Sequence, residues 1–108
     1  MAQPSKMHLI QILLPVYDNE GRPFAHEIYG AIRDELVARF SGLTAYTRAP
    51  AEGLWTRDDK ETSHDEIVVF EVMAVKIDSE WWSEYRRNLE KRLRQESVVI
   101  RTHAIRLL

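Results

Sequence analysis

Cysteine is absent from this sequence, which excludes disulfide bonds, thiolate metal sites and a cysteine nucleophile. Long hydrophobic runs are also absent: the apolar stretch near the N-terminus is too short to span a bilayer, and no small-residue cleavage site follows it. An excess of one charge is missing too, and the formal net charge of −2 would not recruit nucleic acid or an anionic membrane. We therefore expect a cytoplasmic protein that has neither nucleic acid nor a membrane as its partner.

Histidines at the spacing of metal ligands are missing as well. His8, His26 and His64 show no such spacing. The segment "SHDE", Ser63 to Glu66, contains residue types that bind metals, but we interpret it as a solvated loop. The sequence thus predicts neither a metal nor another cofactor.

The residues that are present are those of an ordinary folded domain. With 108 residues, of which 44% are hydrophobic and 30% are charged, the chain suits one domain over residues 1–108. Apolar residues recur at the spacing of strands and helices, and turn-forming residues separate them. The predicted elements are a strand over Met7–Tyr17, a helix over Pro23–Phe40 closed by Gly42, strands over Leu43–Ala49 and Glu66–Ile77, a helix from Asp78 or Ser79 to Glu96, and a strand over Ser97–Leu108.

This order of strand, helix, strand, strand, helix and strand is the ferredoxin-like pattern, of the α+β class. Right-handed crossovers put both helices on the same face of a four-stranded antiparallel sheet, with the first and third strands in the middle. The other face of the sheet is left bare. A bare face must be hydrated, bind a ligand or pair with another copy of the chain.

Side chains alternate between the two faces of a strand, so the sequence predicts which residues line the bare face. That face is mainly apolar, and we expect it to be buried in a homodimer, since burial contributes roughly 25 cal/mol per Å². Two such sheets packed face to face give the dimeric α+β-barrel type of assembly, with a shared interior. The polar residues expected on this face are Gln11, Tyr46, Arg48, Glu71, Arg101 and His103.

Glu71 is the first candidate for chemistry. A carboxylate in the middle of a central strand is costly to bury unless it is paired, and desolvation favours its protonated form, which suits proton transfer. Glu71, Gln11 and either Arg101 or His103 could form a row across the sheet, and His103 could act there as an acid or a base. The competing interpretation, which we favour, is a structural ion pair of Glu71 across the dimer and a satisfied surface or interface histidine at His103.

The connection between the second and third strands holds Trp55, in a loop longer than a hairpin needs. We expect "GLW", Gly53 to Trp55, to fold over the end of the bare face or onto the partner subunit, and Asp58 to His64 to stay mobile. Trp55 then either lines the mouth of a pocket with Tyr46 and Arg48 or plugs the end of the barrel. The plug is the interpretation that we favour.

The second helix carries two features that suggest binding but have simpler explanations. Trp81 and Trp82 point about 100° apart on a helix, so one can enter the core while the other lies at its rim. The basic residues between Arg86 and Arg94 alternate with glutamates, as on a solvated helix face. RNA-recognition domains share this element order, but their central strand carries exposed aromatic residues, whereas Glu71 and Met73 stand here.

The segments "GLTAYTRAPAEGLW" from Gly42, "FEVMAV" from Phe70 and the aromatic and basic spacing of Trp81 to Leu93 resemble those of a group of short bacterial proteins of uncharacterised function. The likeness covers nearly the whole chain, although Leu93 stands where an aromatic residue would complete the last pattern. Many proteins of the dimeric α+β-barrel type bind or transform small apolar or aromatic molecules. We therefore expect a homodimer that binds such a molecule between sheet and helices or in the barrel. The alternative is a cofactor-free enzyme, similar to a monooxygenase or an isomerase, in which Glu71 or His103 moves a proton and Arg48 or Arg101 holds an anionic group.

Overall fold

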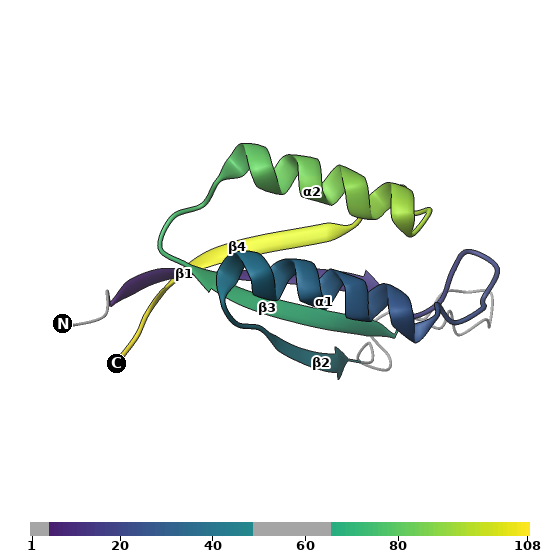
Figure 1. The fold of residues 1–108 in the computed structure, drawn as a ribbon, viewed down its shortest axis with the longest axis horizontal. Coiled ribbons are helices and arrows are strands. Elements are labelled where there is room, and N and C mark those ends of the chain that lie inside the picture. The colour runs from purple at the N-terminus through teal and green to yellow at the C-terminus, as the bar shows by residue number, and fades with distance from the viewer. Residues whose placement is uncertain (1–4, 49–65) are drawn as a thin grey trace, which may run out of the picture.

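The computed structural model describes residues 5–48 and 66–108, and in these ranges it contains four strands and two helices (Figure 1). The elements are β1 (Lys6–Pro15), α1 (His26–Phe40), β2 (Thr44–Arg48), β3 (Ile67–Ala74), α2 (Ser79–Arg92) and β4 (Val99–Arg106). Their order and type agree with the sequence analysis.

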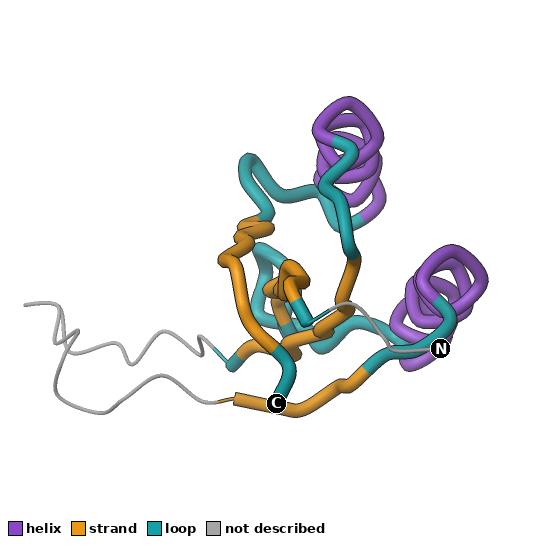
Figure 2. Tube along the Cα trace, turned by 90° about the vertical axis from the view of Figure 1, so that its left-hand side faces the viewer, coloured by secondary structure: helices purple, strands orange, loops and turns teal. Residues whose placement is uncertain are grey.

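The four strands form one sheet in the order β2-β3-β1-β4, and every neighbouring pair is antiparallel. Both helices lie on the same side of the strands, as Figures 1 and 2 show from two directions. The ferredoxin-like α+β fold predicted from the sequence is therefore confirmed, with β1 and β3 in the middle and β2 at an edge. In the ranges that the structure describes, no helix lies on the other face of the sheet.

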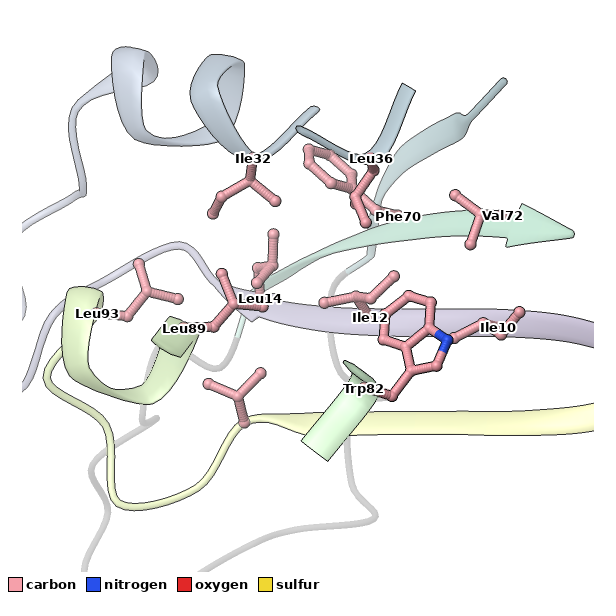
Figure 3. Close-up of a cluster of buried hydrophobic side chains, with 11 residues drawn as sticks. Ile10, Ile12, Leu14, Ile32, Leu36, Phe70, Val72, Trp82, Leu89 and Leu93 are labelled. Carbon is pink, nitrogen blue, oxygen red and sulfur yellow. The ribbon is translucent and has the colours of Figure 1, made fainter. Parts of the chain in front are cut away.

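The core lies between the sheet and the two helices. Alternate residues of the central strands face it and are buried, as the two-residue period requires. In Figure 3 side chains from α1 and α2 converge on those of β1. The buried cluster consists of Ile10, Ile12, Leu14, Ile32, Leu36, Phe70, Val72, Trp82, Leu89, Leu93 and Val98.

The start and the end of α1 differ from the prediction. Pro23 does not occupy the first turn, because it pairs with Tyr17 in an isolated bridge, and the N–H of Phe24 donates to the carbonyl of Val16. The helix therefore begins at His26. At its end Ser41, with φ of 63°, adopts the left-handed conformation that we expected of Gly42.

The helix α2 begins as predicted and ends earlier. Asp78 is its N-cap, and its side chain accepts a hydrogen bond from the N–H of Trp81. At the other end Arg94 has φ of 52°, its N–H donates to the carbonyl of Lys91, and the N–H of Gln95 donates to that of Glu90. This pair of bonds is the Schellman motif, which stops the helix four residues before the predicted end at Glu96.

The strands are also shorter than predicted. The third strand was predicted over Glu66–Ile77 but spans only Ile67–Ala74. The fourth was predicted over Ser97–Leu108 but spans only Val99–Arg106. The extent of β1 sets two of these ends, because Ile67 lies opposite its last residue, Pro15, and Arg106 lies opposite its first residue, Lys6. Within the described ranges, no helix is long and apolar enough to cross a membrane.

Candidate functional site

A row of polar side chains crosses the middle of the bare face. Gln11 of β1 lies directly opposite Glu71 of β3 on one side and Arg101 of β4 on the other. The side-chain amide of Gln11 donates to Oε2 of Glu71 at 2.6 Å, and Nε of Arg101 donates to Oε1 of Gln11 at 2.8 Å. We call these three residues the polar row.

The charges at the two ends of the polar row orient the amide between them. A carboxylate accepts only and a guanidinium donates only, so the NH₂ of Gln11 must face Glu71 and its oxygen must face Arg101. The predicted row is thus present, and Arg101 completes it. His103 lies opposite Leu9, two residues further along the paired strands, and is exposed.

Apolar side chains surround the polar row. Leu9 and Leu13 flank Gln11 along β1 and are half-buried, whereas Met73 and Val99 are 45% and 50% exposed. Val69 is an exception on this face, because it is buried at 1% exposure. Among the described residues, the bare face therefore combines exposed apolar surface with the polar row, and the sequence predicted a mainly apolar face with polar residues in it.

A hollow lies at one corner of this face, where β3 runs three residues beyond the position opposite the first residue of β2. Its volume is about 410 Å³, within the range of small-molecule sites. The sheet contributes Met7, Leu9, Glu71 and Met73, and the end of α1 with the turn into β2 contributes Phe40, Ser41, Gly42, Leu43 and Thr44. We call it the corner hollow. It brings the carboxylate of the polar row to the wall of an otherwise apolar recess.

A second opening lies between α1 and the edge of the sheet, with a volume of about 580 Å³. Its polar lining includes His26, Glu27 and Arg33, which are all exposed. Exposed charges of this kind are already solvated and hold a ligand weakly. The corner hollow differs because Glu71 is half-buried and is held by Gln11.

Two of the predicted site residues, Tyr46 and Arg48, are placed only by their backbone, and a third, Trp55, is not described. The backbone register sets Tyr46 opposite Val69 and Arg48 opposite Ile67, on the strand that borders the corner hollow. Their side chains, and the whole of Trp55 with the expected mobile segment Asp58–His64, lie outside the described residues. Their roles at the mouth of a pocket remain predictions.

A polar cluster between the two helices was not predicted from the sequence. The hydroxyl of Tyr85 donates to Oε1 of Glu35 at 2.7 Å, and Arg92 donates to the same oxygen at 2.9 Å. These residues, with Trp81, Glu84 and Asn88, line an open groove of about 630 Å³. Tyr85 and Arg92 are seven residues apart and share a face of α2, which is a signal in the sequence, but nothing there identifies Glu35 as their partner.

The interactions within this cluster shift the ionisation of its members. Burial raises the pKa of Glu35, but the hydrogen bonds from Arg92 and Tyr85 outweigh burial, so its pKa lies below the ordinary value. Burial raises the pKa of Tyr85, and the neighbouring carboxylate of Glu35 raises it further. Glu35 is thus held ionised and Tyr85 protonated near neutral pH, which suits a structural lock better than proton transfer.

The two adjacent tryptophans take the positions predicted for them. Trp82 is buried and stacks on Phe40 at 5.3 Å between ring centroids, whereas Trp81 is half-buried at the rim. The guanidinium of Arg39 lies 4.2 Å from the centroid of Trp81, and the ring of Tyr85 stacks on it at 4.8 Å. Trp81 is therefore engaged by its own chain, as expected of packing.

Metal-binding residue types do not gather in the part of the chain that the structure describes. In that part no group of three or more His, Cys, Asp or Glu side chains could hold a metal ion. His8 and His26 belong to β1 and α1, on opposite sides of the core, and His64 lies outside the described residues.

Comparisons with known proteins identify a fold and no family. No protein-family model matches the chain, and no curated protein is significantly similar to it in sequence. A solved structure of a phage SAM lyase in complex with S-methyl-5′-thioadenosine is similar in fold, with a TM-score of 0.55 and 10% sequence identity. The match covers 99% of this chain and 94% of the lyase chain. At this identity the likeness concerns the fold alone, so the resemblance to short bacterial proteins stays a prediction.

Proposed function

We propose that this protein binds a small apolar or aromatic molecule in the corner hollow, and that two copies pair through the bare face of the sheet. The observation that carries the proposal is the hollow itself, a recess of about 410 Å³ with a half-buried carboxylate in an apolar wall. Small-molecule sites combine apolar walls with a few fixed polar groups in this way.

The polar row supports binding because it fixes the position of the carboxylate. Glu71 accepts a hydrogen bond from Gln11, whose amide is in turn held by Arg101. A group that is already held in place loses little conformational entropy when a ligand binds. The polar row thus fixes the carboxylate of Glu71 in the wall of the hollow before a ligand binds.

The structural neighbour supports the proposal at the level of architecture. The phage SAM lyase of similar fold is in complex with S-methyl-5′-thioadenosine, a small molecule that carries an aromatic base. In that protein, therefore, a similar fold binds a small molecule with an aromatic ring system. The choice of ligand depends on side chains, which the two chains do not share at 10% identity.

Pairing of two copies is supported by the exposed apolar residues of the bare face. Met73 and Val99 expose about half of their surface there, next to the half-buried Leu9 and Leu13. Burying a few hundred Å² of such surface contributes several kcal/mol at roughly 25 cal/mol per Å². A second sheet of the same shape would cover it and close the hollow on its open side.

An enzymatic role is the second candidate, and the location of Glu71 in the wall of the hollow favours it. In that role Glu71 exchanges a proton with the bound molecule, and the exposed His103 serves as a second acid or base on the same face. The prediction is that Glu71→Gln abolishes turnover of a bound substrate but leaves its binding measurable. Unchanged turnover in this variant would exclude the role.

The binding proposal is tested by filling the hollow. Met73 lines it and is exposed, so Met73→Trp places a large side chain in the recess without disturbing the core. A library of small aromatic compounds is screened against the wild type by ligand-observed NMR, and the compounds that bind are titrated against the variant. We expect at least about a tenfold loss of affinity, the effect of losing roughly 1.4 kcal/mol of contacts.

Val75→Trp is the matched control, because Val75 is 53% exposed and is not among the residues that line the hollow. Binding to this variant should equal that of the wild type. If no compound binds the wild type, or if the bound compounds bind Met73→Trp equally well, the corner hollow is not the site.

A further inference from the structure

We infer that the outer edge of β4 is a second interface between copies of this chain, at which two β4 strands pair antiparallel with Thr102 at their centre. In the sheet order β2-β3-β1-β4, β1 is the neighbour of β4 on one side, and no described strand lies on the other (yellow in Figure 1). The inference goes beyond the proposed function. Hydrogen bonds at an edge run in the plane of the sheet, whereas the bare face packs perpendicular to that plane.

The pairing with β1 determines which backbone groups of β4 point to the outer edge. The N–H of Leu107 donates to the carbonyl of Ser5 at 2.7 Å, and these two residues continue the register in which Lys6 lies opposite Arg106. Ser5 and Leu107 therefore form a hydrogen-bonded pair. Bonded and non-bonded pairs alternate along an antiparallel ladder, so every second residue of β4 directs its N–H and C=O away from β1. The residues that do so are Ile100, Thr102, Ala104 and Arg106.

The edge of β4 lacks the usual protection against pairing. Edge strands that stay single are commonly short, bulged, or marked by proline or lysine. β4 has eight residues, Val99–Arg106, with neither proline nor lysine, and its register with β1 is continuous over that length. Thr102 and Ala104 are exposed. The strand thus offers a regular row of backbone donors and acceptors to another extended strand.

The sequence of β4 is complementary to itself in one register. Two identical antiparallel strands pair about a two-fold axis, and opposed residues lie on the same side of the sheet, so outward-bonding residues oppose outward-bonding residues. With Thr102 at the axis, apolar residues oppose apolar residues, which stabilises a strand pair. The opposed pairs are Val99 with Ile105, Ile100 with Ala104, Arg101 with His103, and Thr102 with Thr102 of the partner subunit.

The neighbouring registers are less favourable. An axis at Arg101 sets two arginines directly opposite each other, and like charges in that position destabilise a strand pair. An axis at His103 sets Arg101 opposite Ile105 and Arg106 opposite Ile100. Axes further from the centre of the strand shorten the overlap. The pairs formed about Thr102 therefore identify a second copy of this chain as the partner of the edge.

Pairing at the edge should be weaker than pairing of the bare faces. It exchanges hydrogen bonds to water for hydrogen bonds between strands and buries little apolar surface. We expect a Kd on the order of 0.1–1 mM. At micromolar concentration the bare face should therefore dominate association, and the edge should contribute at higher concentration.

Thr102→Pro tests the pairing, because the N–H of Thr102 points to the outer edge and its loss removes no bond to β1. Thr102→Val is the matched control, since it changes the same side chain and keeps the N–H. Sedimentation is measured for the wild type and both variants at about 10 µM and about 1 mM. We expect the wild type and Thr102→Val to associate further at the higher concentration, and the Kd of Thr102→Pro to be at least about tenfold higher.

Single cysteines test the register, since the chain has none of its own. The Cα atoms of a hydrogen-bonded pair lie about 5.5 Å apart, within the range of a disulfide, so Thr102→Cys should form linked dimers under mild oxidation at about 1 mM. Ala104→Cys is the control, because the two Ala104 positions lie about 13 Å apart along the strands in this register. It should link at least about tenfold more slowly on non-reducing gels. Both residues lie on the helix side of β4, so pairing of the bare faces brings neither together with its copy.

The outcomes separate this inference from the proposed function. No further association of the wild type at about 1 mM, equal association of Thr102→Pro and the wild type, or equally fast linking of Ala104→Cys and Thr102→Cys overturns the inference. If Thr102→Pro does not fold, the two cysteine variants decide. Monomers at about 10 µM contradict pairing through the bare face, whereas the edge inference depends on the association gained at about 1 mM.

Discussion

At the scale of single residues, one oxygen atom of Glu35 holds the two helices together. It accepts from the hydroxyl of Tyr85 and from Arg92, so a single carboxylate on α1 fastens two positions of α2. The aromatic stack of Phe40 on Trp82 joins the same helices further along. A groove opens between the helices at the polar cluster, so hydrogen bonds replace close packing there.

Removing the hydroxyl of Tyr85 should therefore lower stability. We expect Tyr85→Phe to reduce the free energy of unfolding by about 1 kcal/mol, the usual net value of one hydrogen bond. Urea denaturation measures this change. The effect of Tyr85→Phe should be smaller in a Glu35→Gln background, because the two residues share the bond. Strictly additive effects would show that the bond contributes nothing.

The lowered pKa of Glu35 predicts a pH dependence of stability. A carboxyl whose pKa is lower in the folded state stabilises the fold at pH values above its ordinary value of 4.5. This contribution is lost as pH falls through the folded-state pKa. The difference in unfolding free energy between wild type and Glu35→Gln should thus shrink between about pH 5 and pH 3.

Glu84→Gln is the control for this measurement, since Glu84 lies on the neighbouring helix and is exposed. Its difference from the wild type should stay nearly constant over the same pH range. A difference for Glu35→Gln that grows on acidification would contradict the assignment.

At the scale of the elements, both helices end at a residue in the left-handed conformation that is not glycine. Ser41 follows α1 with φ of 63°, and Arg94 follows α2 with φ of 52°. This conformation costs a residue with a Cβ atom on the order of 1 kcal/mol. The next residue is a glycine, Gly42, but Ser41 and not Gly42 adopts the left-handed conformation.

Substitutions at Ser41 and at the neighbouring Gly42 test which of the two residues adopts the left-handed conformation at the end of α1. Ser41→Gly should raise the free energy of unfolding by about 0.5–1 kcal/mol, because glycine adopts this conformation without strain. Gly42→Ala should be neutral or stabilising, since an added Cβ meets no atom within 4 Å. Thermal and urea denaturation of both variants would decide, and marked destabilisation by Gly42→Ala would restore the prediction made from the sequence.

At the scale of the whole molecule, both described helices cover the same face of the sheet. Helices α1 and α2 cover one face (Figure 2), while the other exposes Met73 and Val99 beside the polar row. Soluble proteins bury surfaces of this kind against a partner. A second copy offers the same shape, and the opposite charges of Arg101 and Glu71 let one sheet face complement another.

A variant on the bare face and a control variant on α1 test the predicted dimer. Val99 is 50% exposed on the bare face, and Val37 is 42% exposed on α1, which covers the opposite face. Sedimentation at micromolar concentration should find a dimer for the wild type and for Val37→Lys, and a monomer for Val99→Lys. Monomers for all three proteins, or a dimer lost only in Val37→Lys, would show that the bare face is not the interface.

The sequence by itself determined the elements and the faces of the strands, because both follow from local periodicity. The two-residue alternation in β1 and β3 separated the buried Ile12 and Val72 from Gln11 and Glu71, and the four-residue spacing of α1 identified Ile32 and Leu36. The predicted positions of the ends of the helices and strands were less accurate. They depend on individual hydrogen bonds, such as that from Phe24 to Val16, which periodicity does not encode.

Only the tertiary structure decided which polar groups meet. The choice of Arg101 over His103 as the end of the polar row follows from the register of β4 on β1, which depends on the pairing of the entire strand. The partnership of Glu35 with Tyr85 joins residues 50 positions apart and requires both helices to be packed on the sheet. The corner hollow exists because β2 begins beside Glu71 while β3 continues to Ala74, a relation between strands that no single segment of sequence contains.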